Sequence, residues 1–540
     1  MSPRILKNLM PFPRITCCIS HASATALVVS ALCFASSAPA QSLTPLLTQP
    51  PTPSIMIKAF AIEGENPLGG EKTQTVLRPF TGEATSIERL REAAKALEAA
   101  LKESGYGFYR VNLPPQTVTD TVKLKLILFT LGKVEIAGNQ YFSTETIRAD
   151  FPTLVEGQSP NTQQLRRNVA MFNEQDGKQV TMTLTESGTR DAIDARLDIK
   201  DTKPNDFFVT LQNNGNDQTG KYRSTLGYQD SYFLGQDQSV SATYTTSPSQ
   251  SADVQQYGVF WSAPLYSLAS SLSAYAVYSD VNSGRVAGFF DVSGQGRFMG
   301  AKWTFHLLPL GDVSHALTLG FDAKQYVNRV VFGGQNTGVD VAAQPVTISY
   351  AGKWHLVRGL AEWHAEYAAN TTGGTGNDAA SYAANRAGST PEWSVLRMNA
   401  NANHEYASGW MAQARWSTQS ADAPLIAGEQ FGLGGAQTLR AYADREASGD
   451  QGQSLALELW SPVLGSNVRL VGFLETGSVS THKPQSGQTA QTELSDLGVG
   501  MRWQFVKEAS LSLDAAQALN DGSSTKAQDW RANLSVVVKF

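Results

Sequence analysis

The longest uniform stretch of this chain, residues 206–540, alternates apolar and polar residues and shows no helical periodicity. Six segments are examples of this alternation: residues 271–278, 313–321, 346–354, 457–460, 468–474 and 509–515. A period of two is typical of β-strands, and transmembrane β-barrel strands show it at this weak level per segment. At roughly 20 to 24 residues per strand and turn, the stretch accommodates about 14 to 16 strands. We therefore expect an antiparallel transmembrane β-barrel with an even number of strands, sixteen being the preferred value.

The end of the chain has the same alternation. One face of the expected last strand carries Leu534, Val536, Val538 and Phe540, and the other carries Ser535, Val537 and Lys539. An outer strand of a soluble β-sandwich could alternate in this way too, so this strand alone leaves both possibilities open.

The overall composition agrees with a barrel around a wet lumen. The mean hydropathy is −0.23, as expected where only the outer half of each strand faces lipid. Charged residues make up 17% of the chain and the formal net charge is −5, which excludes a disordered polyampholyte and a basic nucleic-acid binder.

The first forty residues have the organisation of a secretory signal peptide. Positive residues precede an apolar run over 22–34, and Ala38-Pro39-Ala40 forms a cleavage site before Gln41. All three cysteines lie in this segment: Cys17, Cys18 and Cys33. Cleavage would leave a mature chain without cysteine, which excludes disulfides, thiol nucleophiles and cysteine-ligated zinc. After residue 40 no apolar run reaches about eighteen residues, so no helical anchor is expected.

A proline-rich tail, residues 41–54, is followed by two segments in which helical and strand patterns alternate: residues 55–131 and 132–205. In the first, residues 54–62 are strand-like, and Thr85-Ser86-Ile87-Glu88 forms a capping box before an amphipathic helix that ends at Gly105. Strands are expected at residues 106–111 and 122–128. The second segment repeats this order, with a strand at 133–136, a short helix capped by Ser143, a second helix around residues 165–172, and strands at 179–184 and 193–199. Two similar α+β modules in tandem suggest a docking arm.

Residues 429–442 resemble the inward-folded loop of two-partner secretion transporters, the TpsB or ShlB/FhaC/HecB haemolysin-activator family. The usual motif is a Gly-Gly pair followed by Val-Arg-Gly-Tyr, and this chain has Leu439 for the valine and Ala441 for the glycine. A second motif resembles the family's Phe-x-Asp-x-Gly strand, with Glu475 for the aspartate. The residues matched in the loop are Gly434, Gly435, Leu439, Arg440 and Tyr442, and those in the strand are Phe473, Glu475 and Gly477.

The resemblance extends over nearly all of the mature chain. It implies two periplasmic POTRA domains before the barrel, an inward-folded loop around residues 423–452, and Phe540 as the barrel assembly signal. Members of this family can also carry an N-terminal helix that plugs the barrel. Only about fifteen proline-rich residues, 41–55, precede the first module here, so we do not expect a full-length version.

A long loop that folds back into a lumen needs a backbone that can turn tightly and one fixed contact to the wall. Gly432, Gly434 and Gly435 permit the first, and Arg440 could supply the second, because a guanidinium binds a carboxylate with two parallel hydrogen bonds. The resemblance nominates Glu475 as that carboxylate. An ordinary solvated arginine in an external loop is the alternative.

Enzymatic motifs are incomplete in this chain. Gly215-x-x-x-x-Gly220-Lys221 resembles a phosphate-binding loop, but Tyr222 stands where serine or threonine is needed, so we interpret it as a turn between barrel strands. Gly432-x-Gly434 lacks the third glycine of a dinucleotide site. No Gly-x-Ser-x-Gly or His-Glu-x-x-His motif is present, and we expect no catalytic residue, metal or cofactor.

The resemblance implies an outer-membrane pore whose periplasmic modules bind an unfolded exoprotein and pass it outward without nucleotide hydrolysis. The expected partners are a large secreted β-helical exoprotein (an adhesin, haemolysin or contact-dependent toxin), the barrel assembly machinery during biogenesis, and outer-membrane lipid, with no nucleic acid. Two alternatives stay open. One is an assembly or insertion factor for other outer-membrane proteins, and the other is a general diffusion porin.

Overall fold

A computed structural model describes residues 55–540, apart from gaps at residues 85–86, 118, 217–218, 253, 281–283, 287–289, 293–294, 329–330, 333–334 and 337. The expected signal peptide and proline-rich tail, residues 1–54, lie outside the described residues, as do Thr85 and Ser86 of the expected capping box. Within the described ranges, no helix is both long and apolar enough to cross a bilayer.

The first module combines a three-stranded sheet, in the order β2-β5-β4, with two helices. Its elements are β1 (Ile55–Ile57), β2 (Ala59–Glu63), α1 (Gly70–Leu77), β3 (Gly82–Ala84), α2 (Ile87–Glu103), β4 (Tyr109–Asn112) and β5 (Thr121–Leu128). Strands β2 and β5 run parallel, and β1 pairs with β3. Leu90 and Leu97 of α2 and Val122 and Leu124 of β5 are buried, which is the amphipathic pattern expected for that helix and strand.

Three details of the first module differ from expectation. Residues 55–62 are not one strand, because the Lys58 and Ala59 amides both donate to the Asp120 carbonyl, and the chain changes there from pairing with β3 to pairing with β5. Residue 54, the expected start, lies outside the described residues. Strand β4 begins at Tyr109 and not at residue 106. The reason is that Gly105, with a φ of 93°, terminates helix α2, and the Tyr106 amide still donates a hydrogen bond to the Leu101 carbonyl of that helix. Helix α1 was not predicted, since it is short and buries only Thr73 and Leu77.

The second module has a sheet in the order β6-β8-β7 and two helices. Its elements are β6 (Thr130–Ala137), α3 (Thr144–Asp150), α4 (Thr162–Glu174), β7 (Lys178–Glu186) and β8 (Ala192–Asp201). The predicted cap is confirmed: the Ser143 hydroxyl accepts a hydrogen bond from the Thr146 amide at 3.1 Å. Strand β6 starts two residues before the expected boundary between the modules, and the domain limits themselves stay predictions.

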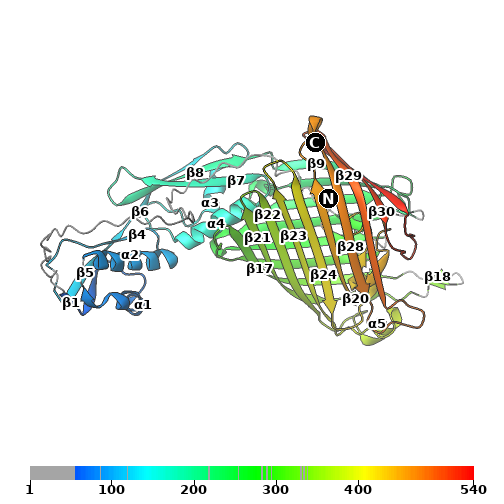
Figure 1. Ribbon diagram of the computed structural model, residues 1–540, viewed down its shortest axis with the longest axis horizontal. Helices are drawn as coiled ribbons and strands as arrows, with labels where there is room; N and C mark the ends of the chain where they lie inside the picture. The colour runs from blue at the N-terminus through cyan, green and yellow to red at the C-terminus, as the bar shows by residue number, and fades with distance from the viewer. Residues whose placement is uncertain are drawn as a thin grey trace, which may run out of the picture. The chain divides into compact units, whose positions relative to one another are not determined.

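Sixteen antiparallel strands of the described chain close into one barrel, which confirms the predicted fold class and strand number (Figure 1). The strands are β9 (Asn205–Gln212), β10 (Arg223–Asp230), β11 (Ser239–Thr246), β12 (Gln255–Leu265), β13 (Ser270–Ser279), β16 (Gln295–His306), β17 (Val313–Val327), the interrupted strand β20 with β21 (Val341–Ala343 and Pro345–Leu356), β22 (Gly359–Asn370), β23 (Ser394–Glu405), β24 (Met411–Ala421), β27 (Gln451–Trp460), β28 (Val468–Ser480), β29 (Gln491–Val506), β30 (Ala509–Ala518) and β31 (Trp530–Lys539). All six segments expected from alternation lie within these strands. Strands β31 and β9 close the barrel, with Ser535 opposite Gln212 and Lys539 opposite Phe208.

Short elements lie in the connections between barrel strands. They are β14 (Gly284–Val286) with β15 (Phe290–Val292), β18 (Val331–Phe332) with β19 (Gln335–Asn336), α5 (Ala379–Asn385), and β25 (Phe431–Leu433) with β26 (Ala447–Gly449). These connections also contain the single 3-10 turns η3 (Phe233–Gly235), η4 (Tyr266–Leu268), η5 (Ala427–Glu429) and η6 (Gly465–Asn467), whereas a further 3-10 turn, η2 (Arg78–Phe80), lies in the first module. The expected turn at residues 215–221 joins β9 to β10, and its Gly215 amide donates to the Lys221 carbonyl at 3.0 Å.

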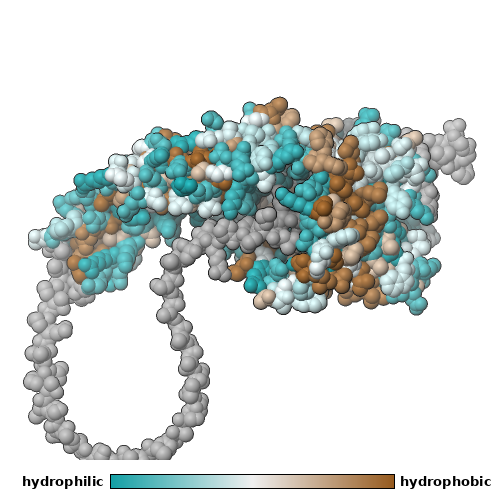
Figure 2. Space-filling view, turned by 90° about the horizontal axis from the view of Figure 1, so that it is seen from above, coloured by the Kyte–Doolittle hydropathy of each residue, from teal (hydrophilic) through white to brown (hydrophobic). Residues whose placement is uncertain are grey.

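Side chains alternate between the two faces of the barrel wall. Along β27, Leu455, Leu457 and Leu459 point outward and are exposed, whereas Glu458 points inward and is buried. Figure 2 shows an apolar band over the barrel. In β31, Leu534, Val536 and Val538 lie on the face opposite the buried Asn533, as the sequence alternation predicts. An apolar outside and a polar inside are the properties of a membrane barrel with a wet lumen.

Candidate functional site

The connection between β24 and β27, residues 422–450, folds into the barrel lumen. Its strands β25 and β26 pair, with Phe431 opposite Gly449. At the tip, Gly434 and Gly435 have φ of 106° and 89°, and a Cβ on Gly434 would overlap the Ala443 carbonyl oxygen. The Thr438 hydroxyl closes this turn by donating to the Gly434 carbonyl and accepting from the Gly434 amide, both at 2.9 Å. The two predicted glycines are therefore required by the backbone itself.

Arg440 lies at this tip and only 2% of its surface is exposed. Its Nη2 atom is 3.2 Å from Glu475 Oε1 on β28 and also contacts Glu458 Oε1 on β27. Nη1 is 3.5 Å from Asp514 Oδ1 on β30. The guanidinium carbon is 4.0 Å from the centroid of the Phe473 ring, which is within cation–π distance. The structure thus brings together three residues that the sequence nominated, Arg440, Phe473 and Glu475, and the latch role of this contact stays a prediction.

The backbone around Arg440 is fixed to the wall as firmly as its side chain. The Arg440 amide donates to Glu475 Oε2 at 2.8 Å, and the next amide, of Ala441, donates to Asp496 Oδ2 on β29 at 2.9 Å. The Arg440 carbonyl accepts from Asn533 Nδ2 on β31 at 2.9 Å. Since a buried main-chain group left unpaired costs roughly 1–3 kcal/mol, the wall residues stabilise one position of the tip. The tip contacts strands from β27 to β31.

Other sequence-nominated residues support the same tip. Leu439 and Tyr442 are fully buried, and the Tyr442 hydroxyl lies within hydrogen-bond distance of the carbonyl oxygens of Ser495 and Asn520, 2.9 Å from each. Gly477 leaves room for the Leu433 side chain, which a Cβ at residue 477 would meet at 2.7 Å. Phe540 lies apart from this cluster. It ends the chain with its side chain 66% exposed and its amide donating to the Phe207 carbonyl at 2.8 Å.

Sequence reasoning missed most of the wall around Arg440. The residues to which the sequence assigned no contact with Arg440 are Arg415, Glu458, Asp496, Arg502, Asp514 and Asn533. Arg415 Nη2 lies 3.0 Å from Glu458 Oε1, and Arg502 Nη1 lies 2.7 Å from Asp514 Oδ1. Each acid sits at an inward position of its strand, which is a signal that alternation could have provided. We call the three arginines and four acids of this set, with Arg440 and Glu475 included, the lumen charge cluster.

A second contact holds the start of the loop to a different part of the wall. Glu429, 3% exposed, accepts hydrogen bonds from Lys324 Nζ at 2.9 Å and the Tyr326 hydroxyl at 2.7 Å, both on β17, and from Arg397 Nη2 on β23 at 2.8 Å. Burial alone would raise the pKa of Glu429, but the nearby Lys324 and Arg397 outweigh it and lower the pKa to about 2. Glu429 is therefore ionised at neutral pH and pairs with two cations.

Asp450 and Glu446 join the end of the loop to other external connections. Asp450 is fully buried, with Arg386 Nη2 at 2.8 Å and the amides of Leu425 and His482 at 2.9 and 2.7 Å. Glu446 accepts from the Thr525 amide at 2.9 Å and the Ser524 hydroxyl at 2.8 Å, in the connection between β30 and β31.

The pKa values of both acids are depressed. Burial would raise the pKa of Glu446, but the Ser524 and Thr525 hydrogen bonds prevail and lower it to about 2. In the same way, burial is outweighed at Asp450 by Arg386 and the two amides, and its pKa is lowered. Both side chains therefore hold their contacts as anions.

A separate ion cluster joins the second module to two barrel turns. Lys178 at the start of β7 is buried, and its Nζ lies 3.2 Å from Asp150 Oδ2 and 2.6 Å from Asp237 Oδ2. Asp237 lies in the turn between β10 and β11 and also accepts from the Tyr266 hydroxyl at 2.6 Å, in the turn between β12 and β13. Burial raises the pKa of Asp150 to about 7; Lys178 acts against this and Asp237 adds to it.

Comparison with known proteins agrees with this architecture. The family model of the haemolysin secretion/activation protein ShlB/FhaC/HecB matches residues 192–503, and the model of the ShlB-type POTRA domain matches residues 55–128. The heme/hemopexin transporter protein HuxB of Haemophilus influenzae is 19% identical over 486 residues, covering 86% of this chain and 83% of HuxB.

Two solved structures share the fold. CdiB from Escherichia coli superposes with a TM-score of 0.70 at 16% identity, over 92% of this chain and 93% of CdiB. CdiB from Acinetobacter baumannii gives a TM-score of 0.69 at 14% identity, over 94% of this chain and 95% of that chain. At these identities the two structures establish the fold alone. Membership of the family rests on the family model, which matches more than half of the chain. The chain belongs to the haemolysin secretion/activation family ShlB/FhaC/HecB, and it is an outer-membrane translocator of two-partner secretion with its N-terminal POTRA modules in the periplasm.

Proposed function

We propose that this chain exports one large secreted exoprotein in an unfolded state, and that the lumen charge cluster is the latch that holds the loop of residues 422–450 inside the barrel. The observation that carries the proposal is the burial of Arg440 among wall carboxylates. A loop whose tip is held by a buried cation has a defined resting position and a defined group to release at that tip. Release of Arg440 would free the lumen for the passenger.

The periplasmic modules would supply the capture step. Each sheet has outer strands, β7 and β6 in the second module and β2 and β4 in the first, and an outer strand can pair with an extended polypeptide through main-chain hydrogen bonds. Such pairing tolerates varied side chains, as recognition of an unfolded chain requires. The periplasm provides no nucleotide whose hydrolysis could drive export. Folding of the passenger outside the cell would therefore make its movement through the barrel directional.

The passenger is proposed to be a β-helical adhesin, haemolysin or contact-dependent toxin. The relative HuxB is named a heme/hemopexin transporter, so a passenger that acts on haem proteins belongs to the same range. We also infer contacts with outer-membrane lipid along the apolar band, contact of Phe540 with the barrel assembly machinery during biogenesis, and neither nucleic-acid binding nor catalysis.

The test is the secretome of a deletion strain. We expect one large protein to disappear from the culture supernatant and to return on complementation, while the levels of other outer-membrane barrels stay unchanged. Depletion of many barrels would favour an assembly factor and contradict the proposal. An unchanged supernatant together with lost permeability to small solutes would favour a diffusion porin.

A further inference from the structure

Strand β23 carries three asparagines at successive positions of its lumen face: Asn399, Asn401 and Asn403. They share this face with Arg397, whose Nη2 atom contacts Glu429 of the inward-folded loop at 2.8 Å. Strands disfavour asparagine, so three of them on one face are not explained by strand formation. We call these three residues the amide ladder.

The side-chain amides of the ladder are accessible from the lumen. Asn399 is exposed, and Asn401 and Asn403 are partly exposed. Asn401 Oδ1 accepts a hydrogen bond from Gln413 Nε2 on β24 at 3.1 Å. Within the described part of the chain, the side chains of Asn399 and Asn403 form no hydrogen bond with another residue. Their donors and acceptors are therefore available to a ligand.

The charged side chains beside the ladder have counter-ions in the wall. Glu362, opposite Asn401 on β22, lies 3.2 Å from Lys353 Nζ on β21. Arg415, opposite Asn401 on β24, lies 3.0 Å from Glu458 Oε1. The ladder therefore adds neutral hydrogen-bonding groups to a wall whose neighbouring charges are paired, and a ligand bound to these groups needs no charge.

The ladder lies between the periplasmic mouth of the barrel and the inward-folded loop. Strand β9 follows directly on the second module, and the antiparallel strands alternate in direction, so β23 runs from the outer end of the barrel to the periplasmic end. Asn403 is near that end, whereas Asn399 is two residues from Arg397, which contacts the start of the loop. A polypeptide entering from the periplasm therefore meets the ladder before it reaches the loop.

The spacing of the ladder matches that of an extended polypeptide. Side chains on one face of a strand repeat at about 7 Å. Main-chain amides and carbonyls on one side of an extended chain repeat at the same interval, because they also alternate with a period of two. Each asparagine offers two donors and one acceptor oxygen. Three asparagines in register can therefore bind the main chain at every second residue.

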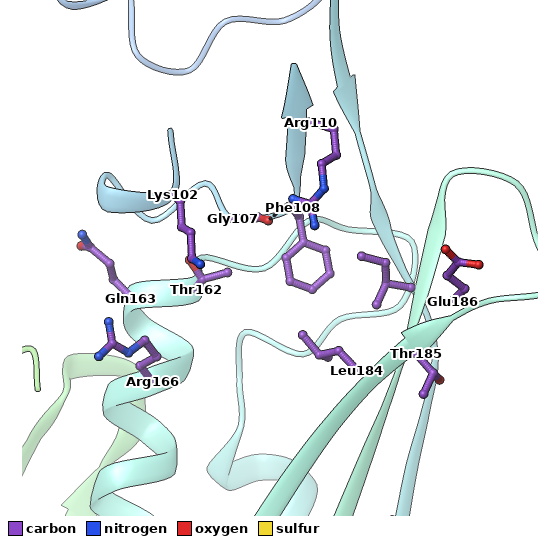
Figure 3. A pocket seen from close by; sticks show the side chains of 11 residues that line it. Lys102, Gly107, Phe108, Arg110, Thr162, Gln163, Arg166, Leu184, Thr185 and Glu186 are labelled. Atoms are coloured by element: carbon purple, nitrogen blue, oxygen red, sulfur yellow. Dashed lines mark hydrogen bonds between the residues drawn. The ribbon is translucent and has the colours of Figure 1, made fainter. Parts of the chain in front are cut away.

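Figure 3 shows a pocket of a different kind on the second module, with a volume of about 380 Å³. Phe108 and Leu184 give this pocket an apolar part, and Lys102 and Glu186 add charges of both signs. A segment bound there would be distinguished by its side chains. The ladder instead presents one neutral group at a regular spacing, which suits the main chain because that is the same in every sequence.

We propose that the amide ladder binds the main chain of the exported protein in extended form and guides it from the periplasmic mouth to the loop of residues 422–450. The inference rests on the proposed export function. It adds the group that is bound inside the barrel, the peptide main chain, and the residues that bind it. Because the ladder is neutral, it holds acidic and basic segments alike.

The probe is a pair of twenty-residue peptides, one of alternating glycine and serine and the other of alternating N-methylglycine and serine. Both carry the same hydroxyls, but the second lacks half of the main-chain donors. Each is added to the full-length protein in planar bilayers, and the duration of current blockades is measured. We expect the glycine-serine peptide to block at least about fivefold longer, as loss of a few weak hydrogen bonds predicts.

The protein-side test is the double variant Asn399→Leu, Asn403→Leu, which removes two amides with little change in side-chain size. Its blockades by the glycine-serine peptide should be as short as those by the methylated peptide, and its export of the passenger should fall at least about fivefold. Asn399→Ser, Asn403→Ser retains hydrogen-bonding groups and should keep most of both. The control Ser241→Leu, Ser273→Leu places the same side chains at inward positions of β11 and β13 and should behave like the wild type.

Four results would overturn the inference. They are equal blockades by the two peptides in the wild type, no blockade by either peptide, normal export by an inserted leucine variant of the ladder, and an equal loss in the control variant. Heat-modifiable migration in gel electrophoresis checks that each barrel is inserted. None of these results touches the proposed function, because loss of the passenger from the deletion strain is measured on its own.

Discussion

Glu475 and Asp496 lie directly opposite each other on β28 and β29, and both point into the lumen, so two carboxylates face one another on the barrel wall. Like charges in this position repel and destabilise a strand pair. Each carboxylate accepts one backbone amide of the loop, that of Arg440 for Glu475 and that of Ala441 for Asp496. The Arg440 guanidinium adds contacts to Glu475 and Glu458. The wall is therefore complementary to the loop tip and unfavourable without it.

Replacement of Arg440 by alanine should leave a correctly inserted barrel that exports its passenger at least about tenfold less well. Removal of one partner from a buried ion cluster costs roughly 3–5 kcal/mol, and here it leaves two arginines facing four acids. The barrel keeps its main-chain ladders, so assembly should persist. Heat-modifiable migration in gel electrophoresis checks insertion, and the amount of passenger in the supernatant checks export.

Lys526→Ala is the matched control for this variant, since it removes an exposed cation from the connection between β30 and β31. It should export normally. Normal export by an inserted Arg440→Ala barrel would show that the buried arginine does not act as a latch.

Replacement of Glu475 by glutamine should be much milder than loss of Arg440. The substitution leaves three acids facing three arginines, and a glutamine oxygen can still accept the Arg440 amide. We expect the barrel of Glu475→Gln to unfold at a higher temperature than that of Arg440→Ala, with most export retained. The gel shift on heating measures the unfolding temperature of both variants, and the amount of passenger in the supernatant measures export. Equal losses in the two variants would mean that one specific pair, and not the charge balance of the cluster, determines stability.

Much of this barrel could be predicted from sequence. Strand number followed from alternation and length, and the Arg440–Glu475 contact followed from a motif shared with a family. The partners Glu458, Asp514 and Asn533 could not be predicted, because they meet Arg440 only through the register of β27, β30 and β31. Alternation places each of them inward but does not set their height in the barrel. For the same reason Glu429, whose partners lie on β17 and β23, was part of the motif without an assigned contact.

Replacement of Glu429 by glutamine should loosen the start of the loop while its tip stays fixed. The change removes the buried carboxylate that Lys324 and Arg397 share and leaves Arg397 with Glu366 at 3.5 Å, which costs more than loss of a surface ion pair. We expect higher and noisier ion conductance in planar bilayers, with barrel insertion unchanged. Glu392→Gln, an exposed acid in the connection between β22 and β23, is the control and should conduct like the wild type. Unchanged conductance of Glu429→Gln would show that the tip alone holds the loop.

The junction of the second module with the barrel should depend on pH through Asp150. Its pKa is raised from 3.8 to about 7, so the folded state binds a proton more tightly than the unfolded state does. Stability from this group is therefore complete below about pH 4, falls as the pH rises towards 7, and is constant above that. The reason is local: Lys178 lies closer to Asp237 than to Asp150, at 2.6 and 3.2 Å, so ionised Asp150 adds a second buried negative charge around one cation.

Asp150→Asn should accordingly stabilise the second module at pH 8, raising its unfolding temperature by roughly a few °C, and should have almost no effect at pH 4. Lys178→Met should do the opposite at pH 8, because it leaves two buried carboxylates without a counter-ion. Differential scanning fluorimetry of the full-length protein in detergent at both pH values separates the two variants. A destabilised Asp150→Asn at pH 8 would mean that the ionised Asp150–Lys178 pair is favourable and that this acid does not take up a proton near neutrality.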